Sequence, residues 1–268
     1  MRGEVIRAER VATQLSGTVS DPAAVVRALL AVQAQDYRAS LWAIALRTPE
    51  ATAADVERAA EAGAIVRTWP MRGTLHFLPA EDVRWMLRLL APRVIAKSAA
   101  RYRELALDTA VFARRYVAGH GPASDRDMAW WTGLPLATAR RALQLADIGD
   151  DESGLNRSET PRAPIAAPRV HLLPPFDEYT VGYQDRSAFL DPAHAERTRN
   201  GIMSPVLLID GRIAGVWSRT AKRDRVEVRV ELFGPVSRPI LRELERAAAR
   251  YGAFLACRAR VDVTRRHG

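Results

Sequence analysis

The sequence predicts an α+β fold, in which two tandem modules of the winged-helix (helix-turn-helix) type precede a β-rich C-terminal domain. Apolar residues recur at helical spacing over residues 4–62 and again over 109–146. Strand-like alternation instead prevails toward the C-terminus and in a short segment after the first helices. We expect three domains, at residues 1–98, 99–168 and 169–268.

The first module is predicted to contain helices followed by a two-stranded ribbon. Asp21 is a good helix N-cap, and Pro22 suits the first helical position, where no amide hydrogen is needed. Pro70 and Gly73 interrupt the alternating segment, which favours two short strands with a tight connection. Helices are expected over residues 4–15, 22–32, 41–46 and 53–62. This order of elements is that of a winged-helix module.

The second module is predicted from the segment "SDRDMAWWTGLPLATARRAL". Ser124 can cap a helix, and Asp127, three residues later, can complete a capping box. Gly133 ends this helix and a further helix follows, which is the helix-turn-helix signature. Arg140 and Arg141 on the last helix are candidate contacts to a phosphate backbone or a groove. The alternative is an ordinary pair of helices whose arginines are solvated.

The C-terminal domain is predicted to be β-rich. Residues 150–169 are polar and rich in proline, which is typical of a linker or a long surface loop. Asp210 and Gly211 predict a hairpin. Beyond it, apolar residues at 226, 228, 230 and 232 alternate with charged ones, which indicates a half-buried antiparallel strand. An amphipathic helix over residues 237–256 and a closing strand complete the domain.

Composition and charge limit the function. The chain has 268 residues, is 48% apolar, and carries a formal charge of +9 with a pI near 10.5. This charge fits an anionic partner such as DNA. Only Lys97 and Lys222 are lysines, however, and an arginine-rich and alanine-rich composition also arises from GC-rich coding sequence. With no signal peptide and no apolar run of membrane-spanning length, we expect a cytoplasmic, nucleoid-associated protein with no membrane partner.

Few residues carry recognisable chemistry. A single cysteine, Cys257, excludes an internal disulfide and a cysteine-based zinc cluster. The sequence has no phosphate-binding glycine loop, and its five histidines are not spaced as metal ligands, so we expect neither a metal nor a cofactor. His76 by itself suggests a structural histidine. Asp177 and Glu178 are expected in a turn, because neighbouring strand residues point apart.

Two glutamines, Gln33 and Gln35, lie where one helical pattern ends and another begins. In a helix, residues two apart point to different sides, whereas in extended backbone they share a face. If the two amides act together, the preceding helix must end near Val32. Asp36 and Ser40 are good caps for the next helix. The alternative is that the glutamines only mark a polar helix end.

Five segments of the sequence together resemble the winged-helix DNA glycosylases of the AlkZ type. They are "AVQAQDYRASLWAIALRT", "RTWPMRGTLHFLPAEDVRWML", "RRYVAGHGPASDRDMAWWTGLPLATARRAL", "HLLPPFDEYTVGYQDR" and "PVLLIDGRIAGVWSR". They come in the order of the family and span most of the chain. The resemblance implies tandem winged helices and a C-terminal β-barrel that together form a DNA-binding cleft.

The resemblance also implies an active site and a substrate. Gln33, Ala34 and Gln35 match the catalytic Gln-aliphatic-Gln motif of the family. We expect both amides to be open to solvent in one cleft, with Gln35 positioning the attacking water and Gln33 stabilising the sugar. The substrates of the family are bulky N7-alkylated purines, including interstrand crosslinks, in double-stranded DNA. Arg72, Thr74 and His76 can share one face of a strand, and the resemblance places this strand beside the motif, so they are candidate DNA contacts. We expect Arg72 or His76 to contact DNA or to support Gln35, and the alternative is a buried structural pair.

One departure from the family leaves two hypotheses. Family members are longer and carry a further winged helix between the second and third of these segments, so this chain resembles a shortened member. The first hypothesis is a monofunctional DNA glycosylase, in DNA repair or self-resistance, that uses the two glutamines. The second is a non-catalytic winged-helix DNA-binding protein, either a regulator or a lesion binder. A regulator would dimerise on a palindromic site, whereas a glycosylase would bind with little sequence preference.

Overall fold

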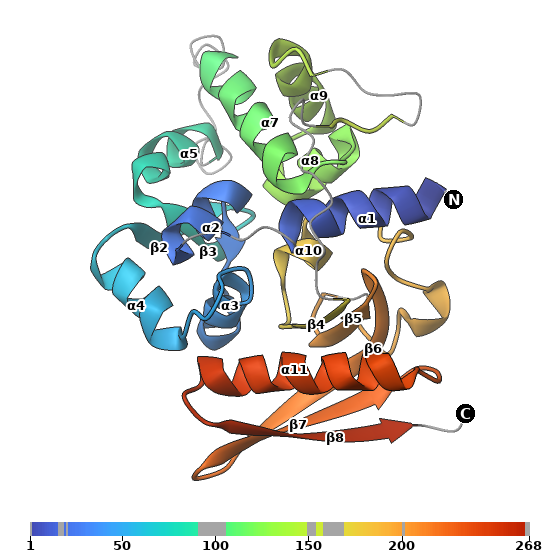
Figure 1. The fold of residues 1–268 in the computed structure, drawn as a ribbon. Helices are drawn as coiled ribbons and strands as arrows, with labels where there is room; N and C mark the ends of the chain where they lie inside the picture. Colours follow the sequence, from blue (N-terminus) through green and yellow to red (C-terminus); the bar gives the residue numbers. More distant parts are fainter. Residues whose placement is uncertain are drawn as a thin grey trace.

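The computed structural model describes residues 2–15, 19, 21–90, 106–148, 154–157, 169–199 and 202–265. Figure 1 shows the helices and strands in chain order. The helices are α1 (Arg2–Gln14), α2 (Pro22–Leu29), α3 (Tyr37–Ala45), α4 (Ala53–Glu61), α5 (Val83–Leu90), α7 (Ala106–His120), α8 (Asp125–Thr132), α9 (Leu136–Leu145), α10 (Glu178–Val181) and α11 (Arg238–Phe254), with short 3₁₀ turns at Ala80–Asp82 and Pro192–His194. The strands are β1 (Val32–Gln33), β2 (Ile65–Met71), β3 (Thr74–Pro79), β4 (Val170–Leu173), β5 (Val206–Ile209), β6 (Arg212–Ala221), β7 (Arg225–Leu232) and β8 (Arg258–Arg265).

The N-terminal helices pack around a small antiparallel sheet with the order β1-β3-β2. The predicted change of period at residue 65 is confirmed, since β2 and β3 form a hairpin through Arg72 and Gly73. Asp21 caps α2 as predicted, with its side chain accepting from Ala24 N–H. The elements from α2 to β3 run helix, strand, helix, helix, strand, strand. That order fits the winged-helix prediction, which stays a prediction.

The central helices α7, α8 and α9 pack against one another and against the N-terminal part. The predicted capping box is present, because Ser124 and Asp127 bond each other's backbone N–H groups at the start of α8. Gly133 ends α8 in the left-handed conformation, with φ of 75°. Among the described residues, strand pairing in this module is limited to one bridge between Ala123 and Asn156. Most of the predicted linker lies outside the described residues.

The C-terminal domain is an open sheet and not a barrel. Its strands follow the order β4-β5-β6-β7-β8, and in the described chain β4 and β8 end the sheet without pairing with each other. The expected β-barrel is therefore wrong. The hairpin at Asp210 and Gly211 and the buried alternation along β7 are as predicted. However, β7 is antiparallel only to β6 and runs parallel to β8, because α11 crosses between β7 and β8.

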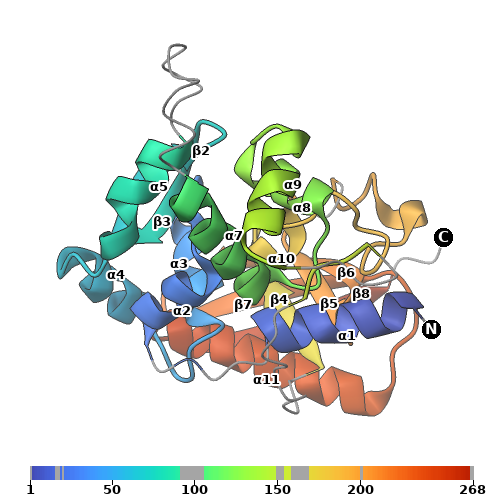
Figure 2. The same ribbon diagram turned by 90° about the horizontal axis from the view of Figure 1, so that it is seen from above.

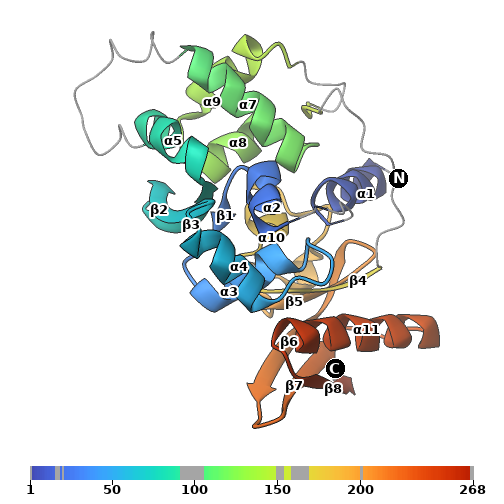
Figure 3. The ribbon, with the colours of Figure 1, turned by 60° about the vertical axis from the view of Figure 1, so that its left-hand side comes forward.

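Two hydrophobic cores connect the three predicted domains. One core combines residues from α5 and α7–α9 with residues from α10 and β5, including Trp131, Tyr179 and Val206. The other combines α2–α4 with the C-terminal sheet and α11. Figure 3 shows the N-terminal sheet between the central helices and the C-terminal layer, and Figure 2 shows α5 beside β2 and β3. The domain boundaries stay a prediction, but the cores explain how distant segments reach one site.

Candidate active site

The two glutamines lie in extended backbone between α2 and α3. Helix α2 ends at Leu29, and Leu30 turns the chain with φ of 68°, a conformation that non-glycine residues seldom adopt. Gln33 then belongs to β1, and Asp36 caps α3 by accepting from Ala39 N–H. The expected end of the helix before the motif is confirmed. Helix α3 begins earlier than expected because Asp36, and not Ser40, is its cap.

Hydrogen bonds hold the backbone of the motif on several sides. Gln33 N–H donates to Glu178 Oε1 at 2.6 Å. Ala34 N–H donates to the Leu75 carbonyl at 2.7 Å. The guanidinium of Arg67 donates twice to the Ala34 carbonyl, at 2.8 and 3.1 Å. These bonds fix the segment in the extended form that two cooperating amides require.

The two glutamine side chains differ in exposure. Gln35 is exposed, and its Oε1 accepts from Leu75 N–H at 3.2 Å. Gln33 is only 9% exposed, and its Oε1 is buried without a hydrogen-bond partner in the described chain. The expectation that both amides are open to solvent is therefore wrong for Gln33. A buried unpaired oxygen costs free energy, and such groups concentrate at functional sites.

His76 lies opposite Gln33 in the ladder. The two residues pair across β1 and β3, so their side chains share one face of the sheet. His76 Nδ1 contacts the Thr74 carbonyl at 2.9 Å, and because a carbonyl only accepts, Nδ1 carries the hydrogen. Nε2 then presents a lone pair. Both Nε2 and Thr74 Oγ1 are buried and have no hydrogen-bond partner in the part of the chain that the structure describes. Burial lowers the pKa of His76 to about 4, so the imidazole is neutral at pH 7.

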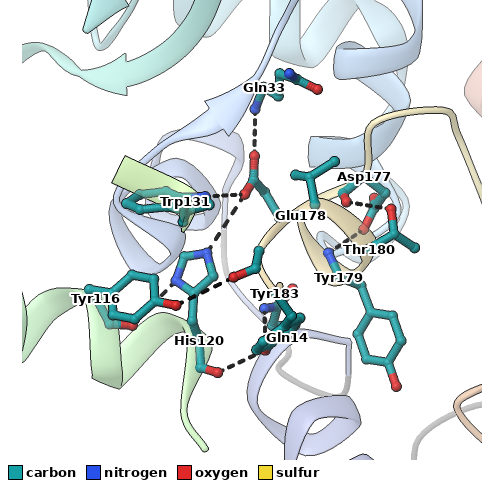
Figure 4. A network of polar contacts seen from close by, with 12 residues as sticks. Gln14, Gln33, Tyr116, His120, Trp131, Asp177, Glu178, Tyr179, Thr180 and Tyr183 are labelled. Carbon is teal, nitrogen blue, oxygen red and sulfur yellow. Dashed lines mark hydrogen bonds and ion pairs between the residues drawn. The ribbon is translucent and has the colours of Figure 1, made fainter. Parts of the chain in front are cut away.

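Glu178 is the centre of a buried polar network (Figure 4). Its side chain has no solvent exposure. Besides the Gln33 bond, Oε2 accepts from Trp131 Nε1–H at 2.8 Å and lies 3.6 Å from His120 Nε2. The His120 ring stacks on Tyr116 and contacts the Tyr116 carbonyl through Nδ1. The network thus joins β1, α7, α8 and α10.

Sequence reasoning missed this role of Glu178. The predicted turn describes Asp177, which caps α10 and forms a buried ion pair with Arg47 at 2.7 Å. Glu178 instead meets residues that are 47 and 145 positions away in the chain. Local patterns carry no signal for such contacts. The only sequence clue was an acidic residue within an otherwise apolar and aromatic segment.

The other predicted DNA contacts are distributed over two modules. Thr74 and His76 lie together on β3, but Arg72 does not share their strand face as expected, because it occupies the turn before β3 with φ of 52°. Its charge nevertheless contributes to the lowered pKa of His76. Arg140 and Arg141 are exposed on α9, where Arg140 pairs with Asp125. No hydrogen bond or ion pair links these two arginines to the Gln33 site within the described ranges.

Among the described residues, no three His, Cys, Asp or Glu side chains are grouped so that they could hold a metal ion. None of the helices in the described ranges is long and apolar enough to cross a membrane.

Comparisons with known proteins agree on one family. The sequence model of the family described as DNA glycosylase AlkZ-like matches residues 26–113 and 108–254. The fold is similar to the solved structure of Streptomyces sahachiroi DNA glycosylase AlkZ, with a TM-score of 0.75 and 20% identity, over 97% of this chain and 99% of that chain. Among curated proteins, no relative matches the sequence. The family match includes both glutamines and Glu178.

Proposed function

Because the chain belongs to the AlkZ-like DNA glycosylase family, we propose that it is a DNA repair enzyme that hydrolyses the N-glycosidic bond of N7-alkylated purines in duplex DNA. Bulky adducts and interstrand crosslinks are the substrates that we assign to it. The observation that carries the proposal is the motif from Gln33 to Gln35. It lies in extended backbone, and the buried Gln33 oxygen faces the same side of the sheet as the lone pair of His76.

An N7-alkylated purine needs little acid catalysis to leave. The purine already carries a positive charge, so the C1′–N9 bond breaks with its electron pair neutralising the base. Positive charge develops on the sugar, and dipoles aimed at that position lower the barrier. Water then adds its oxygen to C1′ and releases a proton to solvent. Two amides can support these steps without a catalytic residue that must change its protonation.

Gln33 and His76 are the residues that we assign to the attacking water. Among the described residues, Gln33 Oε1 and His76 Nε2 are both buried acceptors without hydrogen-bond partners, at paired positions of β1 and β3. A water that donates to two acceptors turns a lone pair outward, as attack on the sugar requires. The Thr74 hydroxyl, two residues before His76, adds a further polar group on the same face.

Gln35 is assigned to the sugar. Its side chain is exposed, and its Oε1 is already bonded to Leu75 N–H, so its NH₂ group is the part that can bind DNA. This assignment reverses the roles expected from the sequence, because burial places Gln33 deeper than Gln35. We assign amides, an imidazole, a hydroxyl and a carboxylate to the site. None of these groups is an amine that could form a Schiff base. The product is therefore an intact abasic site, as in a monofunctional glycosylase.

Incubation with duplex DNA methylated at guanine N7 tests this function. The expected products are free 7-methylguanine, measured by chromatography, and abasic sites that break only after alkali treatment. A duplex without the methyl group is the matched control and should stay intact. Binding to both duplexes without release of base would contradict the proposal and support the alternative, a non-catalytic DNA-binding protein.

A further inference from the structure

We propose that Glu178 is a positioning residue for Gln33, and that its buried carboxylate sets the place of the Gln33 amide in the active site. This inference rests on the proposed catalytic role of Gln33. Glu178 itself does not touch the substrate. It acts through the hydrogen bond that it accepts from the backbone N–H of Gln33.

Strand β1 needs such support because it is very short. It contains only Val32 and Gln33, and it lies at one end of its sheet, with β3 on one side. The ladder therefore holds it through two residue pairs. An end strand leaves backbone groups without a strand partner on its outer side. The Gln33 N–H finds its acceptor in Glu178 at 2.6 Å, which is a short, charge-assisted hydrogen bond.

The carboxylate is itself firmly held. Burial alone would raise its pKa, but the contact with His120, the nearby His76 and the bond from Trp131 outweigh burial, and the pKa of Glu178 lies below its usual value. The carboxylate therefore stays ionised at neutral pH. Trp131 and His120 come from α8 and α7, so the position of β1 depends on the packing of the central helices.

The substitution Glu178→Gln separates positioning from simple packing. The amide has the same shape but only one acceptor oxygen. It cannot accept from both Gln33 N–H and Trp131 Nε1–H, so one donor must face an NH₂ group. We expect the single-turnover rate of base release to fall at least tenfold, while DNA affinity changes less than twofold. Loss of a residue that only stabilises the fold would not lower the rate of base release while leaving DNA affinity nearly unchanged.

Asp82→Asn is the matched control. Asp82 is also a buried carboxylate that accepts from a tryptophan N–H, here Trp85 at 2.7 Å, and pairs with an arginine, Arg115. It has no bond to the Gln33 segment in the described chain. We expect Asp82→Asn to lower the free energy of unfolding without a selective loss of base release.

A double-mutant cycle tests whether Glu178 acts through Gln33. In a Gln33→Ala background, adding Glu178→Gln should lower the rate less than twofold further, because the side chain that it positions is gone. Equal effects in both backgrounds would overturn the proposal. So would a Glu178→Gln protein that releases base at the wild-type rate.

A spectroscopic measurement keeps the inference separate from the proposed function. In the NMR spectrum of the wild-type protein, the Gln33 amide proton should resonate far downfield and exchange slowly with solvent, and Glu178→Gln should shift it upfield. This measurement does not depend on enzymatic activity. The wild-type spectrum and exchange rate are also informative when the variant does not fold. A Gln33 amide that exchanges as fast as an open amide would overturn the positioning role. Failure of base release alone would overturn only the glycosylase assignment.

Discussion

At the scale of single residues, the backbone and the side chain of Gln33 have opposite surroundings. The backbone N–H meets a buried carboxylate, whereas the side-chain oxygen is buried with no partner in the described chain. The first contact fixes the residue, and the second leaves a strong acceptor available for a water. Stability alone would favour pairing both groups. The combination is what a site that holds a reactive water requires.

The buried histidines predict acid sensitivity. Burial lowers the pKa of both His76 and His171 to about 4, against an ordinary value of 6.5. Between pH 4 and pH 6.5 the unfolded chain therefore binds more protons than the folded protein. The stabilising contribution of each neutral histidine is fully present above about pH 6.5 and is lost as pH falls through 4. This difference in pKa corresponds to about 3 kcal/mol in the free energy of unfolding for each histidine.

Urea unfolding at several pH values measures this effect. His171 lines no part of the proposed site, and both of its ring nitrogens are buried without partners in the described chain. In His171→Leu, the free energy of unfolding should fall less between pH 6.5 and pH 4 than in the wild type. An unchanged pH dependence would show that His171 is protonated equally well in both states.

The residues of the site were predictable from sequence only in part. Gln33 and Gln35 could be paired because i and i+2 residues share a face in extended backbone, which is a local property, but only the resemblance to the glycosylase family gave them a catalytic role. Asp36 and Ser124 could be found as caps for the same reason. Glu178 could not, because its partners come from β1, α7 and α8, and only tertiary packing brings these elements together.

At the scale of elements, the contact between α2 and α7 positions the motif. A side chain at Gly119 would place its Cβ 2.5 Å from the Ala28 carbonyl oxygen in α2. We expect Gly119→Ala to push the two helices apart and to lower the free energy of unfolding by about 1–3 kcal/mol. Gly234→Ala is the control, because its Cβ would meet no atom within 4 Å. Equal urea midpoints for the two variants would contradict this view of the contact.

The β2–β3 hairpin presents an exposed aromatic side chain. Trp69 is 62% exposed on β2, close in sequence to the exposed Arg72 in the turn. A stacked base contributes about 1–3 kcal/mol to binding, so Trp69→Ala should weaken duplex binding roughly tenfold in fluorescence anisotropy. Met203→Ala, which removes another exposed apolar side chain, is the control. Equal affinities for both variants would exclude Trp69 from the DNA interface.

Element prediction succeeded where the pattern was local and failed where it was not. The β2–β3 hairpin and the helices α8 and α9 follow from period changes and caps. Strand β1 is too short to have a period. The barrel was wrong because closure depends on how the first and last strands of a sheet meet, and here α11 returns the chain to place β8 beside β7.

At the scale of the whole molecule, three distant parts of the chain build one site. The N-terminal part supplies the glutamines and His76, the central helices supply His120 and Trp131, and the segment after the linker supplies Glu178. The two shared cores keep these parts together. The net charge of +9 fits a duplex DNA partner for the assembled surface.

The most direct test of the account compares single-turnover base release by the wild type, Gln33→Ala, Gln35→Ala and the double variant on N7-methylated duplex DNA. Each single substitution should lower the rate by about two orders of magnitude, the scale for loss of one preorganised polar group, while duplex affinity and the urea midpoint stay nearly unchanged. A double variant that releases 7-methylguanine at the wild-type rate would contradict the central claim that these two amides carry out the reaction.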